Sequence, residues 1–454
     1  MFTPSTNHCD TPRHRYVPDY IPNGAQDSLQ STLFTSVSIA ILKTNVIMND
    51  AARDAAIETL CDARLHQSLI LPASALPDTN IKTPLRITYS DIGYSPLHSP
   101  QHNPPTNGVA EAEPNSDQEP CVVLFIGGLM GGRYTLCRIA NTARRFKVRI
   151  ITIDRPGMGG STPVHLEHRL AVHLTTIPAL LSHLDIKHVT LASHSGGAPY
   201  LLQTLLMHRS FLHPARPHVV MLAPFVPPND SGAPLMRLTA SLPSGLISRF
   251  HSAATLVNRT ITVSAGISLP FSQAGAMPTV TNAINAEEGN DEMEKAVLKN
   301  MEKLSMQYVF AENISGSSDD ALLYLRKKTS SNGTVPEGQP TEEWLDWASL
   351  AGKVAAVERE RRTHMDPDER SSALHSETEK LRFDAFHAEK DIMSGTKGAR
   401  YFDACWERHS ADLDYVSKVT EGTNHDSILD PSLGVVDTWL QGVAERWYGP
   451  TENT

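Results

Sequence analysis

Cysteine is scarce in this 454-residue sequence, and no two cysteines form a Cys-x-x-Cys pair. The five cysteines are far apart: Cys9, Cys61, Cys121, Cys137 and Cys405. An odd number at such spacing argues against a disulfide framework and against a zinc site. We therefore expect reduced thiols in an intracellular compartment.

Long apolar runs and an excess of basic residues are also lacking. The most apolar early stretch, residues 33–42, contains Thr and Ser and is too short to span a bilayer. The N-terminus has no secretory signal pattern, so we expect a cytoplasmic protein without stable membrane insertion. The formal net charge of −10 argues against nucleic-acid binding, because no broad face would neutralise phosphates. The oligomeric state stays open.

What is present is an alternation of short apolar runs with stretches of helical periodicity. The apolar runs lie at 121–126, 148–153, 189–192 and 219–223, and the helical stretches at about 134–145, 166–184 and 198–209. Such alternation is typical of βαβ units and a parallel sheet. Right-handed crossovers then place helices on both faces of the sheet.

The sequence predicts four segments. Residues 1–80 form an N-terminal extension, partly disordered, with a helix over about 48–70. Residues 81–226 form the first part of an α/β core and begin with a strand at 85–92. Residues 227–380 are a mainly helical and polar insertion, and residues 381–454 complete the core. The expected elements of this last part are strands at 381–387 and 415–419 and helices at 399–408 and 433–447.

The strongest local signal lies in Val189-Thr-Leu-Ala-Ser-His-Ser-Gly-Gly-Ala, where an apolar strand runs through Ser195 into a helix. This small-x-Ser-x-small pattern is typical of a nucleophile elbow. The serine sits on a sharp, strained turn, so the residues two positions away, Ser193 and Gly197, must be small. The dipole of the following helix favours negative charge beside the serine. A glycine-containing turn without catalysis is the alternative interpretation.

With this pattern the chain resembles the α/β-hydrolase superfamily, on the side of serine esterases, lipases and prolyl-peptidase-like enzymes. Three further segments match its motifs in the right order: the glycine pairs of 125–133, Asp154-Arg-Pro-Gly-Met-Gly-Gly-Ser, and Glu421-Gly-Thr-Asn-His-Asp. The resemblance covers about 85–226 and 380–448. It implies an α/β fold with a mainly parallel sheet, helices on both faces and a large helical cap inserted after the sixth strand. Such a cap would exclude water and gate entry.

The resemblance also implies a catalytic triad. Ser195 is the expected nucleophile, His425 the general base and Asp391 the acid that holds the imidazole in one tautomer. The three residues stand in the chain order of this fold. Competing candidates for the acid are Glu389, Asp384 and Asp230.

An oxyanion hole needs two backbone N–H groups aimed at the carbonyl oxygen of the substrate. The resemblance assigns these groups to Leu129 and Gly196. Gly127 and Gly128 permit a tight turn and a close approach of the backbone to the substrate. Gly127 replaces the histidine that is common at this position of the family. The segment 154–161 is expected to shape the loop beside the pocket without a catalytic role.

Three other polar residues near these motifs have simpler explanations. His194 follows the strand next to Ser195 and is expected to point elsewhere, while His387 lies inside a strand and is expected to be packed. Asp430 forms with His425 an H-x4-D pattern known from some acyltransferases. Because Pro431 follows, Asp430 more simply caps the last helix.

The expected reaction is transfer of an acyl group from a small-molecule substrate to water, and an ester is the commonest substrate in the family. No metal and no organic cofactor are implied. Two alternatives remain open. One is other chemistry on the same triad, as in an acyltransferase, an amidase or peptidase, or a lyase. The other is a non-catalytic binding protein with this fold.

Overall fold

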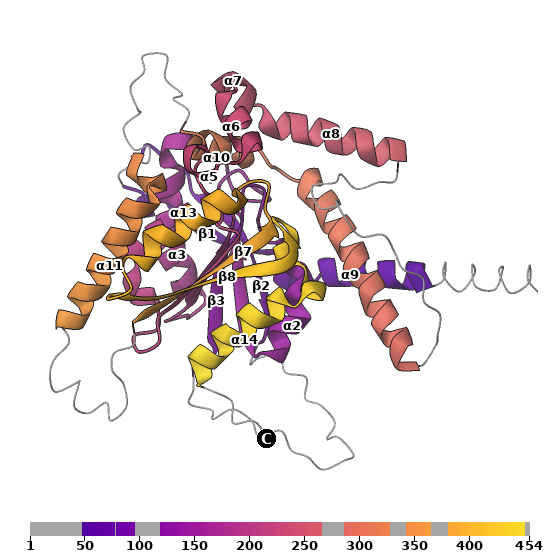
Figure 1. Cartoon of the computed structure of the whole chain (residues 1–454). Coiled ribbons are helices and arrows are strands. Elements are labelled where there is room, and N and C mark those ends of the chain that lie inside the picture. Colours follow the sequence, from indigo (N-terminus) through magenta and orange to yellow (C-terminus); the bar gives the residue numbers. More distant parts are fainter. Residues whose placement is uncertain are drawn as a thin grey trace, which may run out of the picture.

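The computed structural model describes residues 48–77, 79–95, 119–265, 286–326, 342–364 and 380–449. Eight strands form one sheet in the order β1-β2-β4-β3-β5-β6-β7-β8 (Figure 1). The strands are β1 (Gln67–Leu71), β2 (Leu85–Gly93), β3 (Cys121–Ile126), β4 (Val148–Ile153), β5 (Thr190–His194), β6 (His218–Leu222), β7 (Leu381–Lys390) and β8 (Leu413–Asn424). β1 and β2 pair antiparallel to their neighbours, and all later pairings are parallel.

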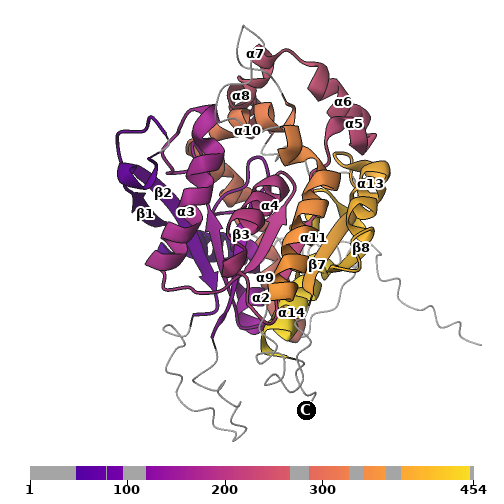
Figure 2. The same ribbon diagram turned by 90° about the vertical axis from the view of Figure 1, so that its left-hand side faces the viewer.

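Helices cover both faces of the sheet, which explains the continuous apolar runs of the sequence. One face packs against α3 (Arg169–His183), α4 (Gly197–Met207), α11 (Trp347–His364) and α13 (Gly395–Glu407), and the other against α2 (Ala140–Arg145) and α14 (Val435–Tyr448) (Figure 2). In β3, Val122 and Leu124 join the first core while Val123 and Phe125 join the second. The predicted α/β fold with a mainly parallel sheet is thus confirmed.

The N-terminal part of the sheet departs from the prediction. Residues 48–60 are helical, but the helix predicted to continue to residue 70 ends there. The side chain of Asp62 accepts a hydrogen bond from the Arg64 amide and begins a short 3-10 turn (Ala63–Leu65). The chain then forms β1, which pairs with β2 at the edge of the sheet. This strand was missed because its five residues are too few to show a period of their own.

The segment between β6 and β7 contains seven described α-helices in three places. Near the carboxyl ends of the strands lie α5 (Pro228–Ser231), α6 (Pro234–Ser241), α7 (Ser244–Ile247), α8 (Phe250–Ala265) and α10 (Gly316–Tyr324), at the top of Figure 1. By contrast, α9 (Ala286–Ala311) contributes Met301 and Leu304 to the core on the side of α2. α11 packs beside α4 and α13. The division of the chain into a core and a cap stays a prediction.

None of the described helices is both long and apolar enough to cross a membrane. The apolar stretch 33–42 and the predicted disorder of the first residues lie outside the described part of the chain.

Candidate active site

Ser195 stands on the turn between β5 and α4, with a φ of 49°. A positive φ is strained for a residue with a Cβ, and such strain concentrates at functional turns. The Ser195 amide donates to the Leu222 carbonyl at 3.0 Å, which anchors the turn to β6. A Cβ added to Gly197 would lie 2.1 Å from the Ile126 carbonyl oxygen, so that position cannot carry a side chain. Ser193 is fully buried at the end of β5, and the sharp turn forms with it in place of glycine.

Ser195 is hydrogen-bonded to His425, which is in turn hydrogen-bonded to Asp391. The Nε2 atom of His425 lies 2.7 Å from Ser195 Oγ, and its Nδ1 atom lies 2.9 Å from Asp391 Oδ2. Asp391 follows β7 and His425 follows β8, so all three side chains come from the carboxyl ends of parallel strands. The structure therefore brings the three predicted residues together in one chain of hydrogen bonds.

The surroundings of His425 and Asp391 fix their protonation. Burial lowers the pKa of His425, but the hydrogen bond and charge of Asp391 outweigh burial and raise this pKa above its usual value. Burial raises the pKa of Asp391, yet His425 and the amides of Ser394 and Met393 hold it below its usual value. A charged Asp391 keeps a proton on Nδ1 of the imidazole. Nε2 is then left to accept the proton of the Ser195 hydroxyl.

The competing acids have other partners. Asp384 accepts a hydrogen bond from His218 at 2.8 Å. Glu389 accepts one from the Gly422 amide at 2.7 Å. Asp230 lies in α5, and in the described part of the chain no hydrogen bond joins it to His425. Asp391 is therefore the carboxylate that the fold places against the imidazole.

The other two histidines singled out in the sequence also have partners. His387 is buried in β7 and bonds Asp403 at 2.7 Å. His194 directs Nε2 to the backbone carbonyl of His425 at 2.8 Å, and burial lowers the pKa of His194 to about 3. Asp430 accepts from the Ser432 amide and begins a short 3-10 turn ahead of α14, close to its predicted capping role.

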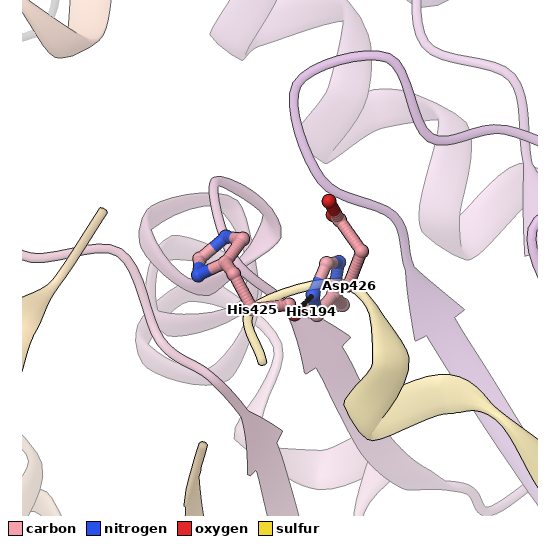
Figure 3. Close-up of side chains that lie close together, drawn as sticks. All are labelled: His194, His425 and Asp426. Carbon is pink, nitrogen blue, oxygen red and sulfur yellow. Dashed lines mark hydrogen bonds between the residues drawn. The ribbon is translucent and has the colours of Figure 1, made fainter. Parts of the chain in front are cut away.

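His194, His425 and Asp426 offer ligand atoms within 4.8 Å of one another (Figure 3). In the figure the imidazole of His425 turns away from the ring of His194. Both ring nitrogens of His425 are already hydrogen-bonded to Ser195 and Asp391. A metal ion held by this group would therefore compete with Ser195 or Asp391 for a ring nitrogen of His425.

The predicted oxyanion donors lie on the two loops beside Ser195. A Cβ added to Gly128 would lie 3.2 Å from the Ser195 Cβ, so this loop passes close to the serine. Within the described ranges, neither the Leu129 amide nor the Gly196 amide donates to an acceptor of the protein. Gly196 precedes α4, whose first N–H groups have no partner within the helix. Both amides are thus free to bind a ligand.

Arg155 is the residue that the sequence analysis missed. Its fully buried guanidinium donates to the carbonyls of Gly127 and Gly128, each at 2.5 Å, and to Asp320 at 2.9 Å. Asp320 belongs to α10, and so does Tyr324, whose hydroxyl donates to the Gly196 carbonyl. The motif at 154–161 was expected only to shape a loop. No sequence pattern links Arg155 to a carboxylate so far along the chain.

The family model described as "Alpha/beta hydrolase family" matches residues 123–299 of the chain. A comparison with curated proteins finds no match.

Many solved structures are similar to this one. A membrane phospholipase A described as a bacterial virulence factor is 10% identical, with 94% of this chain and 100% of that chain covered and a TM-score of 0.46. An epoxide hydrolase from Vigna radiata is 12% identical, with 84% and 97% covered and a TM-score of 0.43. A thermophilic esterase from Thermogutta terrifontis is 10% identical, with 83% and 99% covered and a TM-score of 0.42. These likenesses are too remote to carry over an activity.

Proposed function

Because the chain belongs to the α/β-hydrolase superfamily, we propose that it is a serine hydrolase that cleaves a carboxylic ester of a small molecule. The observation that carries the proposal is the continuous hydrogen-bonded chain from Ser195 Oγ through His425 to Asp391. A nucleophile, its base and a group that orients the base are the parts that covalent acyl transfer requires.

In the proposed reaction Ser195 Oγ attacks the ester carbonyl while its proton passes to Nε2 of His425. Asp391 stabilises the imidazolium that forms. The N–H groups of Leu129 and Gly196 bind the oxygen as it gains negative charge. When the C–O bond to the leaving group breaks, His425 returns the proton to the departing alcohol. Water then attacks the acyl-enzyme while its proton passes to His425. The acyl–Oγ bond breaks, the acid is released, and His425 returns the proton to Ser195 Oγ.

Hydrolysis of p-nitrophenyl esters of increasing acyl length, measured for the wild type and two serine variants, tests this proposal. Ser195→Ala should lower kcat by a factor on the order of 10⁴ to 10⁶ while the protein stays folded, because triad members act as a unit. Ser193→Ala is the matched control, since the Ser193 hydroxyl is buried in the same turn and has no hydrogen-bond partner among the described residues. It should retain activity close to that of the wild type.

Equal activity of the wild type and Ser195→Ala would contradict the proposal. A small alcohol added to the assay separates hydrolysis from acyl transfer. If the acyl-enzyme partitions mainly to the alcohol at low concentration, the protein is an acyltransferase that uses the same triad.

A further inference from the structure

Asp320, Arg155 and Arg169 form a cluster of buried charges that contacts the loop carrying Leu129. Asp320 of α10 is fully buried and accepts hydrogen bonds from Arg155 at 2.9 Å and from Arg169 at 2.7 Å. Tyr200 of α4 donates its hydroxyl to the same carboxylate at 2.8 Å. Burial raises the pKa of Asp320, but the two guanidinium groups outweigh burial and hold this pKa below its usual value. The carboxylate is therefore charged, and two arginines fix its position.

Only one of these two arginines reaches the loop. Arg155 donates to the carbonyls of Gly127 and Gly128, whereas Arg169 donates to the carbonyl of Pro156. The carbonyl of Gly128 and the N–H of Leu129 belong to one planar, trans peptide unit, so the two groups point in opposite directions. A guanidinium that holds the Gly128 carbonyl on one side therefore directs the Leu129 N–H to the other side. That N–H has no acceptor among the described residues.

α10 also contacts the second expected donor. The Tyr324 hydroxyl donates to the Gly196 carbonyl, and a Cβ added to Gly196 would lie 2.6 Å from the Tyr324 ring. Tyr324 itself is buried. One helix of the insertion therefore holds Arg155 through Asp320 and packs against the backbone of Gly196.

We propose that Arg155 is a positioning residue for the oxyanion hole and that α10, through Asp320 and Tyr324, is a fixed part of that hole. This inference rests on the proposed function, because it assigns a task to the Leu129 and Gly196 amides. Moving α10 away would separate Asp320 from Arg155 and Arg169, and breaking a buried ion pair is strongly unfavourable.

The test compares Arg155→Lys with Arg169→Lys in the full chain. Both variants keep a positive charge beside Asp320, and both replace a buried guanidinium. Only Arg155→Lys removes the double contact with the loop carbonyls. We expect Arg155→Lys to lower kcat about 10- to 100-fold and to leave KM within about threefold of the wild type. This loss of kcat is smaller than the loss caused by deleting an oxyanion donor outright, because the Leu129 amide is still present. Arg169→Lys should lower the melting temperature about as much as Arg155→Lys does, but keep kcat within about threefold of the wild type.

A milder pair covers the case in which Arg155→Lys fails to fold. Tyr324→Phe removes the hydroxyl that holds Gly196, and Tyr200→Phe removes the neighbouring hydroxyl that bonds Asp320. We expect the rate of phosphonylation by a fluorophosphonate probe to fall at least threefold further for Tyr324→Phe than for Tyr200→Phe.

Equal kcat losses in the arginine pair, or equal rates in the tyrosine pair, would overturn the inference and leave the proposed function standing. A wild type that neither hydrolyses esters nor reacts with the probe would overturn both.

Discussion

Two aspartates support the groups around Ser195, the half-buried Asp391 and the fully buried Asp320, and their partners differ in one respect. Asp391 faces His425, whose charge can change near neutral pH, whereas Asp320 faces two arginines whose charge is permanent. On the proposed mechanism the first carboxylate stabilises a charge that appears and disappears in each turnover. The second balances charges that never change. One aspartate thus serves the reaction, and the other serves the architecture around it.

The largest expected effect is on the rate, at the first aspartate. Asp391→Asn should lower kcat/KM by a factor on the order of 10⁴, because an amide no longer holds the productive tautomer of His425. The melting temperature should change little by comparison. Steady-state kinetics with thermal unfolding checks both statements. If Asp391→Asn were active and Asp230→Asn inactive, the acid of the triad would be Asp230 of α5.

The next effect is on stability, at the second aspartate. Asp320→Asn should lower the free energy of unfolding by about 3–5 kcal/mol, because two buried guanidinium groups lose their counter-charge. The neighbouring Asp319 is a matched control, since its side chain is 34% exposed and lies 3.5 Å from Arg169. Asp319→Asn should cost at most about 1 kcal/mol.

Denaturant unfolding gives the free energy of unfolding of Asp319→Asn and Asp320→Asn. Similar losses for Asp319→Asn and Asp320→Asn would show that α10 is not held by the buried charges.

The smallest effect is on the pH profile. The pKa of His425 is raised, and the base must be neutral to accept a proton, so activity should rise with pH and reach half its maximum above the usual histidine pKa of about 6.5. Asp391→Asn removes the main group that raises the pKa of His425, and burial then lowers this pKa against the smaller effect of Asp426. The midpoint of any residual activity should therefore fall. Asp320→Asn should leave the midpoint in place. A pH–rate profile of the three proteins decides this, and a shift in Asp320→Asn would contradict the separation of roles.

Much of the site could be predicted because its parts follow recognisable strands. Ser195, Asp391 and His425 each come directly after a strand, and the carboxyl ends of parallel strands converge at one edge of the sheet. The need for a small residue at Gly197 was also predicted, and the structure gives the reason, since a side chain there would collide with the backbone of β3. Their convergence is what the sequence predicted, and their catalytic roles stay a proposal.

The support of the oxyanion loop could not be predicted from the sequence. Arg155 lies in a motif that was noticed, but its partner Asp320 is 165 positions away in a helix with no family pattern. An ion pair between distant segments leaves no periodic signal, and a charged residue in a polar insertion normally indicates a solvated face. β1 was missed for a related reason, because its pairing with β2 is visible only in the sheet.

The proposed role of Ser195 is tested most directly by reacting the purified chain with a fluorophosphonate probe and mapping the modified peptide by mass spectrometry. We expect a single adduct on Ser195 that is absent from Ser195→Ala and retained in Ser193→Ala. A folded wild type that stays unmodified, or an adduct on any other serine, would contradict the assignment of Ser195 as an activated nucleophile.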